Sequence, residues 1–238
     1  MRNDFEFKGV RLSSFGGWVC ESMSIIRGKD KVETVKIAGS SRILHVRESE
    51  DAMDNVTIPI RCVVPAGADL DAIFAWLRGD GRLIRSCDEA HFHRAFALSG
   101  IEMERVIPGS GIRRFTVNFD CDPRRFLWPQ PQTQILSSPG RIRNDGSGRC
   151  EPLIRVYGAQ GLEGCTLMVG NHSMVIDHAG TMLTLDCDAR LAIDKDGKLR
   201  NSDVMRVGDW IQIAAGGDMC SWSGGIDRVE VETNAWDY

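Results

Sequence analysis

Two histidines and one acidic stretch have the residue types and spacing that could bind a metal. His91 and His93 lie two residues apart, so a strand would place both imidazoles on one face. No neighbouring acidic or thiol group completes such a site, and we interpret them as an exposed or edge pair. Residues 194–197, Asp-Lys-Asp-Gly, look like the start of a calcium loop, but the twelfth position needs a bidentate glutamate and is Met205. The stretch therefore predicts a hairpin turn, and no metal or cofactor is expected.

Two further groups of residues could in principle perform catalysis. Ser173, Asp177 and His178 carry the letters of a hydrolase triad, but no Gly-x-Ser-x-Gly elbow or oxyanion-hole signature accompanies them. Asp186 and Asp188 would share one face of a strand, where paired acids are more often a solvated sheet edge than a glycosidase dyad. We therefore predict no catalytic residues and no enzyme activity.

Eight cysteines are scattered through the chain without a Cys-x-x-Cys pair or the spacing of a structural zinc site. A chain of 238 residues does not need disulfides to hold its core. We expect most of these cysteines to be reduced, small core residues.

Two groups of residues are candidates for contact surfaces. Arg113, Arg114, Arg124 and Arg125 flank a predicted strand and add positive charge to an acidic chain, either for ion pairs between subunits or to keep a solvated strand edge from aggregating. Six tryptophans are many for a chain with so few other aromatics, and tryptophan is enriched at interfaces. Trp236, near the C-terminus, has no predicted strand to hold it and is a candidate to dock on the first domain or on a neighbouring subunit.

The elements around these residues begin with one short amphipathic helix at about residues 69–78. Leu70, Ile73, Phe74 and Leu77 form its predicted buried stripe, Asp69 can cap its start, and Gly79 marks its end. The sequence predicts a reversal at residues 79–81 and a half-buried strand at residues 115–119, where apolar and polar residues alternate. Residues 32–37 and 56–62 also alternate as strands, with Pro59 indicating an edge or a bulge.

The second half of the chain predicts strands only. Polar, proline-interrupted residues 129–134 indicate a break between domains. We expect a first domain at residues 1–132, a linker at 133–137 and a second domain at 138–238. Short strands separated by turn signals such as Gly170-Asn171 favour a β-sandwich for the second domain.

Composition excludes several classes of protein. A hydrophobic content of 42% is enough for a real core, which argues against a disordered chain. A net charge of −4 gives no reason to expect nucleic-acid binding, which needs a basic surface. No apolar run approaches the ~20 residues of a membrane helix, and the first residues lack the apolar core of a secretory signal. Synthesis in the cytoplasm is expected, without a membrane partner.

The order and spacing of these segments resemble the distal tail protein (Dit) family of long-tailed bacteriophages and prophages. Each motif alone is a commonplace strand or turn, but together they cover nearly the whole chain. The segments that carry the resemblance are residues 7–10, 74–77, 86–88, 91–95, 117–123, 138–140, 152–158 and 184–186.

The resemblance implies a mainly β fold with one helix, made of an N-terminal ring-forming domain and a C-terminal galectin-like β-sandwich. It implies a homo-hexamer, as one ring or as stacked rings, that connects the tail tube to the baseplate or tip and lets DNA pass through its lumen. The implied partners are the tail tube or terminator protein, the tape measure protein and the tail-associated hub protein. The protein would be made in the cytoplasm of the host bacterium and would reside at the tail tip of the virion.

Two alternatives stay open from the residues alone. The predicted sandwich could be a carbohydrate-binding module for host adsorption if Trp210 and Trp222 form an exposed aromatic platform. A hydrolase would require Ser173, Asp177 and His178 to converge in a pocket.

Overall fold

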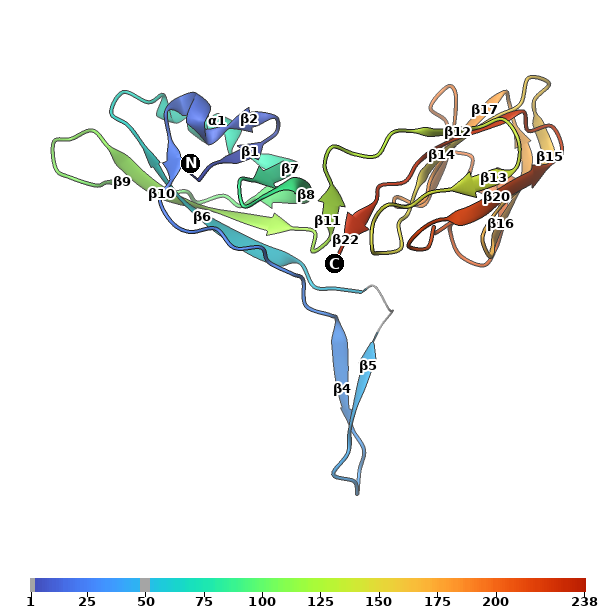
Figure 1. Ribbon diagram of the computed structural model, residues 1–238, viewed down its shortest axis with the longest axis horizontal. Coiled ribbons are helices and arrows are strands. Elements are labelled where there is room, and N and C mark those ends of the chain that lie inside the picture. The colour runs from blue at the N-terminus through green and yellow to red at the C-terminus, as the bar shows by residue number, and fades with distance from the viewer. Residues whose placement is uncertain (1–2, 48–51) are drawn as a thin grey trace. The chain divides into compact units, whose positions relative to one another are not determined.

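The structure is a computed structural model that describes residues 3–47 and 52–238 (Figure 1). It divides into two compact units, Met1–Trp128 with Tyr238, and Pro129–Asp237. Residues 1–2 and 48–51 of the expected first domain lie outside the described residues. The boundary between the units precedes the expected linker at residues 133–137, and that segment contains a short strand, β12 (Gln134–Leu136).

The first unit is built on one curled antiparallel sheet with the strand order β2-β1-β7-β8-β10-β6-β3. The short strand β9 adds to β10, and β11 adds to β8. A 3₁₀ turn, η1 (Leu12–Phe15), follows β2. The strands of this sheet are β1 (Phe5–Phe7), β2 (Val10–Arg11), β3 (Trp18–Val19), β6 (Val56–Val64), β7 (Gly79–Arg85), β8 (Asp88–Ala97), β9 (Glu104–Arg105), β10 (Arg113–Cys121) and β11 (Arg125–Leu127).

Alternation along β10 explains which face of this sheet is buried. Phe115, Val117 and Phe119 are buried, whereas Thr116 and Asn118 between them are exposed. The strand predicted at residues 115–119 is therefore confirmed and extends further at both ends. Pro59 lies in β6 opposite Asn118 of β10, beyond the stretch of β6 that pairs with β3. It therefore stands where β6 has no second neighbour among the described residues, as expected of an edge proline.

The predicted helix is confirmed as α1 (Leu70–Trp76), whose N-terminus is capped by the Asp69 carboxylate accepting from the Ala72 amide. The buried stripe differs from the prediction, because Phe74 is exposed and Trp76 is buried. The Trp76 indole donates to the Phe7 carbonyl at 2.8 Å and stacks on Phe5 with 5.4 Å between the ring centroids. A helix of two turns buries only a narrow stripe of side chains. In α1 this stripe includes Trp76, which is held by its hydrogen bond, and leaves out Phe74.

The reversal predicted at residues 79–81 is wrong in its position. Gly79 and Gly81 belong to β7, and the chain turns instead at Ser86 and Cys87, where Arg85 and Asp88 pair across the β7–β8 hairpin. Gly79 has a positive φ of 73°, a conformation that glycine adopts without strain, and it lies where the chain leaves the helix and enters β7.

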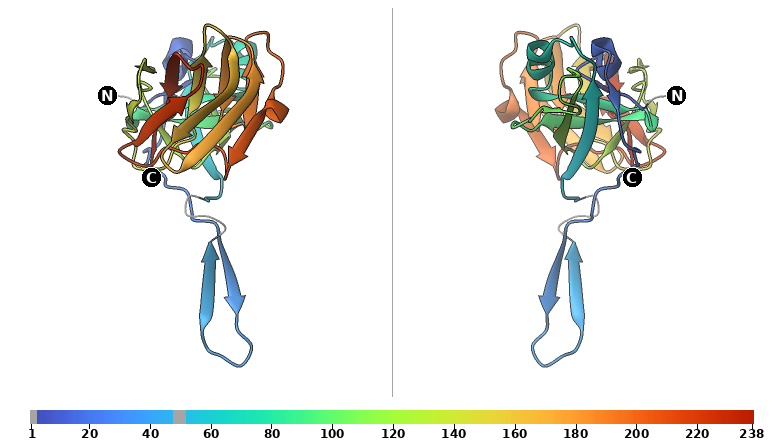
Figure 2. Two further views of the ribbon diagram at one scale, coloured as in Figure 1. Left: turned by 90° about the vertical axis from the view of Figure 1, so that its right-hand side faces the viewer. Right: turned by 90° about the vertical axis from the view of Figure 1, so that its left-hand side faces the viewer.

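Strands β4 (Val32–Lys36) and β5 (Ile43–Arg47) form a separate two-stranded hairpin within the first unit (Figure 2). Five residue pairs join them, from Val32 opposite Arg47 to Lys36 opposite Ile43. The first of these strands was predicted, and the second was not.

The second unit contains two five-stranded antiparallel sheets with the orders β12-β21-β14-β17-β18 and β13-β20-β15-β16-β19. Each sheet alternates buried and exposed residues, as the predicted sandwich requires. The strands are β13 (Gly140–Ile142), β14 (Leu153–Tyr157), β15 (Leu162–Val169), β16 (His172–Ala179), β17 (Met182–Asp186), β18 (Leu191–Asp194), β19 (Val204–Val207), β20 (Asp218–Ser223) and β21 (Arg228–Glu232). A 3₁₀ turn, η2 (Asn201–Asp203), precedes β19, and the two-residue strand β22 (Trp236–Asp237) ends the unit.

The mainly β fold with one helix is thus confirmed. Within residues 3–47 and 52–238, no helix is long and apolar enough to span a membrane.

Candidate functional site

The two histidines of β8 are more enclosed than the expected exposed or edge pair. His91 Nδ1 lies 2.6 Å from an Asp88 oxygen, and Arg125 donates to the other oxygen of Asp88 at 3.0 Å. His93 is only 3% exposed, and its Nδ1 lies 3.1 Å from the Asp122 carbonyl. These contacts engage both imidazoles in the packing of the first unit. Among the described residues, no group of three or more potential ligands is placed to hold a metal ion.

The stretch that looks like a calcium loop is a hairpin turn, as predicted. Asp194 is buried, and its carboxylate accepts from the amides of Asp196 and Lys198 and from the Arg200 guanidinium at 2.9 to 3.0 Å. Hydrogen bonds from the backbone, followed by the Arg200 side chain, hold the pKa of Asp194 below its usual range. This carboxylate is therefore occupied in closing the turn.

The residues considered for catalysis do not converge. His178 lies on β16 with its Nδ1 3.3 Å from a Glu163 oxygen of the neighbouring strand, and Ser173 lies at the other end of β16. Asp186 accepts from the Ala189 amide within the turn after β17. The described side chains therefore form neither a Ser-His-Asp arrangement nor an acid pair in a pocket at these positions.

Three of the four candidate arginines are engaged within the first unit. Arg114 pairs with Glu104 at 3.0 Å. Arg124 contacts both oxygens of Asp122, at 2.6 Å for the nearer one. Arg125 pairs with Asp88 and also donates to the Tyr238 carbonyl at 3.2 Å. Arg113 is half-buried and has no side-chain partner among the described residues. A role of these arginines between subunits stays a prediction.

Trp236 is held by a strand, contrary to the expectation from sequence. It belongs to β22 and is 1% exposed. Its indole donates to the Arg149 carbonyl at 2.7 Å within the second unit. A Cβ added at Gly148 would lie 2.3 Å from its ring, so a glycine is needed for this close packing. An interface role of Trp236 stays a prediction.

The tryptophans considered for sugar stacking do not form an exposed platform. Trp210 is 3% exposed, with the Arg206 guanidinium 5.2 Å from its ring centroid, and Trp222 is half-buried. Trp76 is also a core residue. The alternative of a carbohydrate-binding module therefore loses the feature on which it depended.

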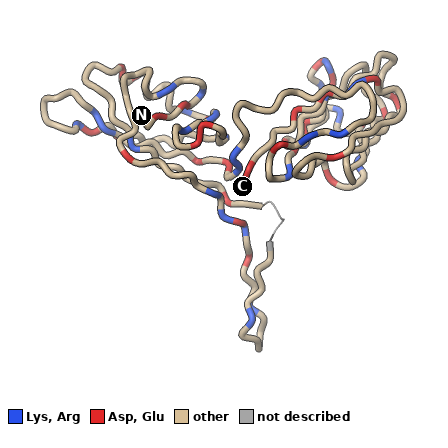
Figure 3. The backbone as a smooth tube through the Cα atoms, in the orientation of Figure 1, with Lys and Arg blue, Asp and Glu red and all other residues tan. Residues whose placement is uncertain are grey.

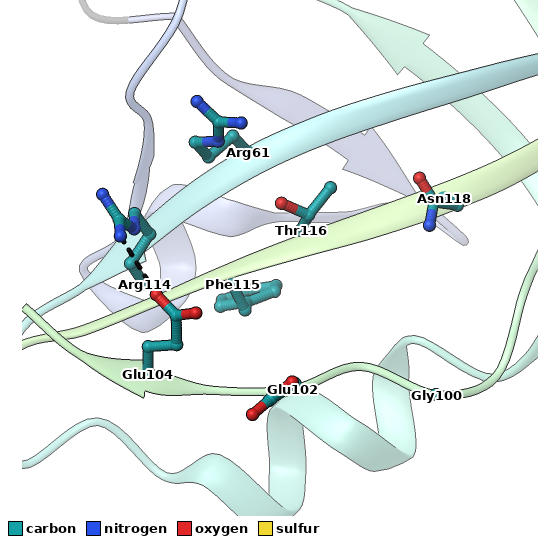
Figure 4. A pocket seen from close by; sticks show the side chains of 8 residues that line it. All are labelled: Arg61, Gly100, Glu102, Glu104, Arg114, Phe115, Thr116 and Asn118. Atoms are coloured by element: carbon teal, nitrogen blue, oxygen red, sulfur yellow. Dashed lines mark hydrogen bonds and ion pairs between the residues drawn. The ribbon is translucent and has the colours of Figure 1, made fainter.

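A polar groove on the first unit has a volume of about 450 Å³. Arg61 of β6 and Arg114, Thr116 and Asn118 of β10 supply one wall, and the segment before and within β9 supplies Glu102 and Glu104 (Figure 4). Glu102 has no ion-pair partner among the described residues. A groove with both signs of charge, a hydroxyl and an amide can bind a polar segment of another protein.

The β4–β5 hairpin is the second candidate surface, because one of its faces exposes three aliphatic side chains beside Glu33. Val35, Leu44 and Val46 share this face, as the pairs Val35–Leu44 and Glu33–Val46 show. Their exposed fractions are 44%, 49% and 47%. Lys36 and Arg42 lie near the tip, where Figure 3 shows the blue positions. Apolar side chains exposed on a narrow hairpin indicate a surface that another chain covers.

Reasoning from sequence missed both surfaces. The groove combines residues from β6, β9 and β10, and no local signal brings these strands together. The hairpin carried a signal, since residues 43–47 alternate as residues 32–36 do, separated by a turn that contains Gly39. The exposure of its apolar face was not visible in the sequence.

The chain has the fold of known phage tail proteins. No family model matches it, and no curated protein matches it by sequence. The crystal structure of the Dit protein (gp 19.1) of SPP1, titled a paradigm of the hub adsorption apparatus in Gram-positive infecting phages, matches with a TM-score of 0.69 and 14% identity over 98% of this chain and 99% of that one. A chain of the phage P2 baseplate in its activated conformation with Ca matches with a TM-score of 0.60 and 7% identity, over 98% of both chains. The form of that baseplate with Sr matches with the same score and identity, over 98% of this chain and 97% of that one.

Proposed function

We propose that this chain is a structural hub of a phage tail tip, which forms a hexameric ring and connects the tail tube to the baseplate or tip proteins. DNA would pass through the lumen of the ring. The observation that carries this proposal is the likeness of fold to SPP1 Dit, which extends over both units and 98% of the chain. We infer a structural and non-enzymatic role, consistent with the dispersed positions of the residues considered for catalysis.

The hairpin supports self-assembly. Val35, Leu44 and Val46 leave an apolar face exposed in the single chain, and burying it against a second copy would remove this face from water. A contact between two different surfaces of identical chains repeats by rotation, and every copy is satisfied only if the ring closes. A closed ring therefore fits a chain that carries one such hairpin.

The proposed partners are the tail tube or terminator protein, the tape measure protein and the tail-associated hub protein. The polar groove between Arg61, Glu102 and Arg114 is a suitable contact for one of them. Arg113 and the outward-facing part of Arg114 would add ion pairs, whereas Arg124 and Arg125 are mostly engaged in their own unit. The protein would be made in the host cytoplasm and located at the tail tip.

The proposal is tested by the native mass of the purified protein, measured by light scattering after gel filtration, with negative-stain images of the same fraction. We expect a six-fold ring with a central hole. The double variant V35T/L44T should weaken ring formation by about tenfold or more, because ~2 kcal/mol of apolar burial is lost at each contact.

The matched control is V32T/I43T, which changes two exposed aliphatic side chains on the other face of the same hairpin. It should form rings as the unchanged protein does. Equal loss in both double variants would show that hairpin stability, and not its apolar face, controls assembly. A strict monomer that is also absent from purified tail tips would overturn the proposed function.

A further inference from the structure

The second unit has two outward sheet faces, and one of them carries charged side chains that pair with one another. On the sheet β12-β21-β14-β17-β18, Arg155 pairs with Glu232 at 2.6 Å and Arg228 pairs with Glu230 at 3.1 Å. The Tyr157 hydroxyl donates to Glu230 as well. Such surface ion pairs are typical of a sheet face that is exposed to solvent.

The outward face of the other sheet carries a different set of side chains. One row across four strands consists of Ser221, Met168, Ser173 and Val207. The next row consists of Ser223, Thr166, Val175 and Met205. We call these two rows, together with Met219 at the end of β20, the methionine face. None of its side chains is charged.

The methionine face is well exposed in the single chain. Met205, Val207 and Met219 are 59%, 66% and 60% exposed, and Met168 is 42% exposed. Charged groups occur at its border: Arg141 lies opposite Met219 on β13 and donates to the Gly216 carbonyl, and Asp177 lies further along β16. The centre of the face is thus uncharged, with Met and Val side chains among Ser and Thr hydroxyls, and the charges lie at its border. Protein interfaces are likewise depleted of charged residues at their core and polar at their rim.

We propose that the methionine face is a docking surface for an uncharged, apolar surface of a different protein of the tail. The face has no cation for a phosphate or an anionic headgroup, and no aromatic ring for a sugar. Methionine side chains are flexible and polarizable, and they adapt to a partner of another shape. The contrast with the salt-bridged sheet of the same unit indicates that solubility alone does not explain the uncharged face.

The size of the face favours a different protein over a second copy. Four strands ~4.8 Å apart and rows ~7 Å apart cover roughly 300 Å², whereas a stable pair of proteins buries about 800 Å² on each partner. Such a small patch suits a partner that several copies bind at once, because multivalency then strengthens a weak single contact. This inference rests on the proposed function, which supplies the repeated copies.

Oxidation of the methionines by hydrogen peroxide tests the proposal without changing the face. The variant I135M serves as internal control, because Ile135 is 61% exposed on the other sheet of the same unit. In the isolated protein, Met168, Met205, Met219 and the methionine of I135M should be oxidised at similar rates. In purified tailed particles that contain the protein, oxidation of the first three should slow by about tenfold or more, and that of the control should not.

A photo-crosslinking amino acid at position 205 or 135 of the same particles identifies the occupant. We expect position 205 to crosslink to another tail protein, and position 135 not to. In addition, V207E should release that protein from the particles, whereas I135E should retain it. Both substitutions place a carboxylate at an exposed position, so a general loss of folding would affect both variants.

Three results would overturn the inference. If the three methionines are oxidised as fast in particles as in the isolated protein, the face is not covered. If they are already protected in the isolated protein, or position 205 crosslinks to the chain itself, the occupant is a second copy. If the protein is absent from the particles, the proposed function fails and the inference fails with it, whereas presence with unprotected methionines overturns the inference alone.

Discussion

At the scale of single residues, Arg85 and His93 are the polar side chains whose burial has the clearest consequence. Both are 3% exposed, and Arg85 Nη2 and His93 Nε2 have no hydrogen-bond partner among the described residues. A carbonyl can only accept, so the hydrogen of His93 must be on Nδ1, facing Asp122, and Nε2 carries a lone pair. A neutral His93 beside a cationic Arg85 is therefore the arrangement that the interior tolerates.

This arrangement predicts a loss of stability in mild acid. Burial has the largest effect and lowers the pKa of His93. The hydrogen bond to the Asp122 carbonyl opposes it, Arg85 and Arg125 lower the pKa further, and Asp88 raises it. The unfolded chain therefore binds a proton more readily than the folded one near and below pH 6.5. The stability that the neutral imidazole contributes is fully present above this pH and is lost as the pH falls, by at most about 1.4 kcal/mol per pH unit.

Urea unfolding at pH 7.5 and 5.5 measures this effect. The variant H93N keeps a donor near the Asp122 carbonyl and should show a smaller loss between these two values than the unchanged protein. The control H45N removes a histidine from the exposed hairpin and should leave the loss unchanged. An equal loss in H93N and the unchanged protein would contradict the assignment to His93.

A second prediction at this scale concerns Gly148. A Cβ at this position would lie within 2.3 to 2.5 Å of the Trp236 ring, so G148A should destabilise the second unit by ~1 to 3 kcal/mol through overpacking. G180A is the matched control, because nothing lies within 4 Å of a Cβ at Gly180. Denaturant unfolding followed by tryptophan fluorescence compares the two variants, and equal stabilities would show that the backbone near Trp236 yields easily.

At the scale of elements, α1 and β10 show what periodicity can and cannot predict. The helix lies where its apolar spacing and Asp69 cap placed it, and β10 alternates as expected. The choice between Phe74 and Trp76 as the buried aromatic was decided by Phe5 and Phe7 of β1, distant in sequence. The turn was predicted too early because Gly79 and Gly81 are typical turn residues. In the structure Gly81 lies within β7, where Lys8 and Phe7 pack closely against it.

The cap of α1 supports a prediction with a conservative control. D69A removes the acceptor of the Ala72 amide and should cost about 1 kcal/mol, whereas D69N can still accept this hydrogen bond and should cost much less. The midpoint of urea unfolding of the first unit measures the difference. Equal destabilisation by both variants would point to the charge of Asp69 instead of its cap.

At the scale of the whole molecule, the eight cysteines show how well the two units shield their interiors from solvent. All are free thiols, and six are buried, two in the first unit and four in the second: Cys62, Cys121, Cys150, Cys165, Cys187 and Cys220. Burial raises the pKa of Cys121 and of Cys150 to about 12, and that of Cys220 to about 11. Burial keeps a reagent away from all six thiols. The raised pKa also reduces the reactive thiolate form of Cys121, Cys150 and Cys220, so these thiols should react slowly.

Titration with a thiol reagent at pH 8 tests this. The native protein should expose only Cys20 and Cys87 on the time scale of minutes, and the protein denatured without reductant should expose all eight. The variant C20S should remove one of the two fast equivalents. A large shortfall after denaturation would contradict reduced core cysteines, and fast reaction of more than two would show that one unit opens readily.

The mainly β class, the single helix with its cap, several strands and the resemblance in segment order could all be predicted from the amino-acid sequence. These features depend on residues close together in the chain, whose periodicity and turn chemistry act locally. The partners of the arginines and histidines could not be predicted in this way, since Asp88 contacts Arg125 and His93 contacts Asp122 only after the sheet has formed. The exposure of Val35 and Leu44 on one hairpin, and of Met168 and Val207 on one sheet, also depends on the folded chain, because it is set by which faces the other elements cover.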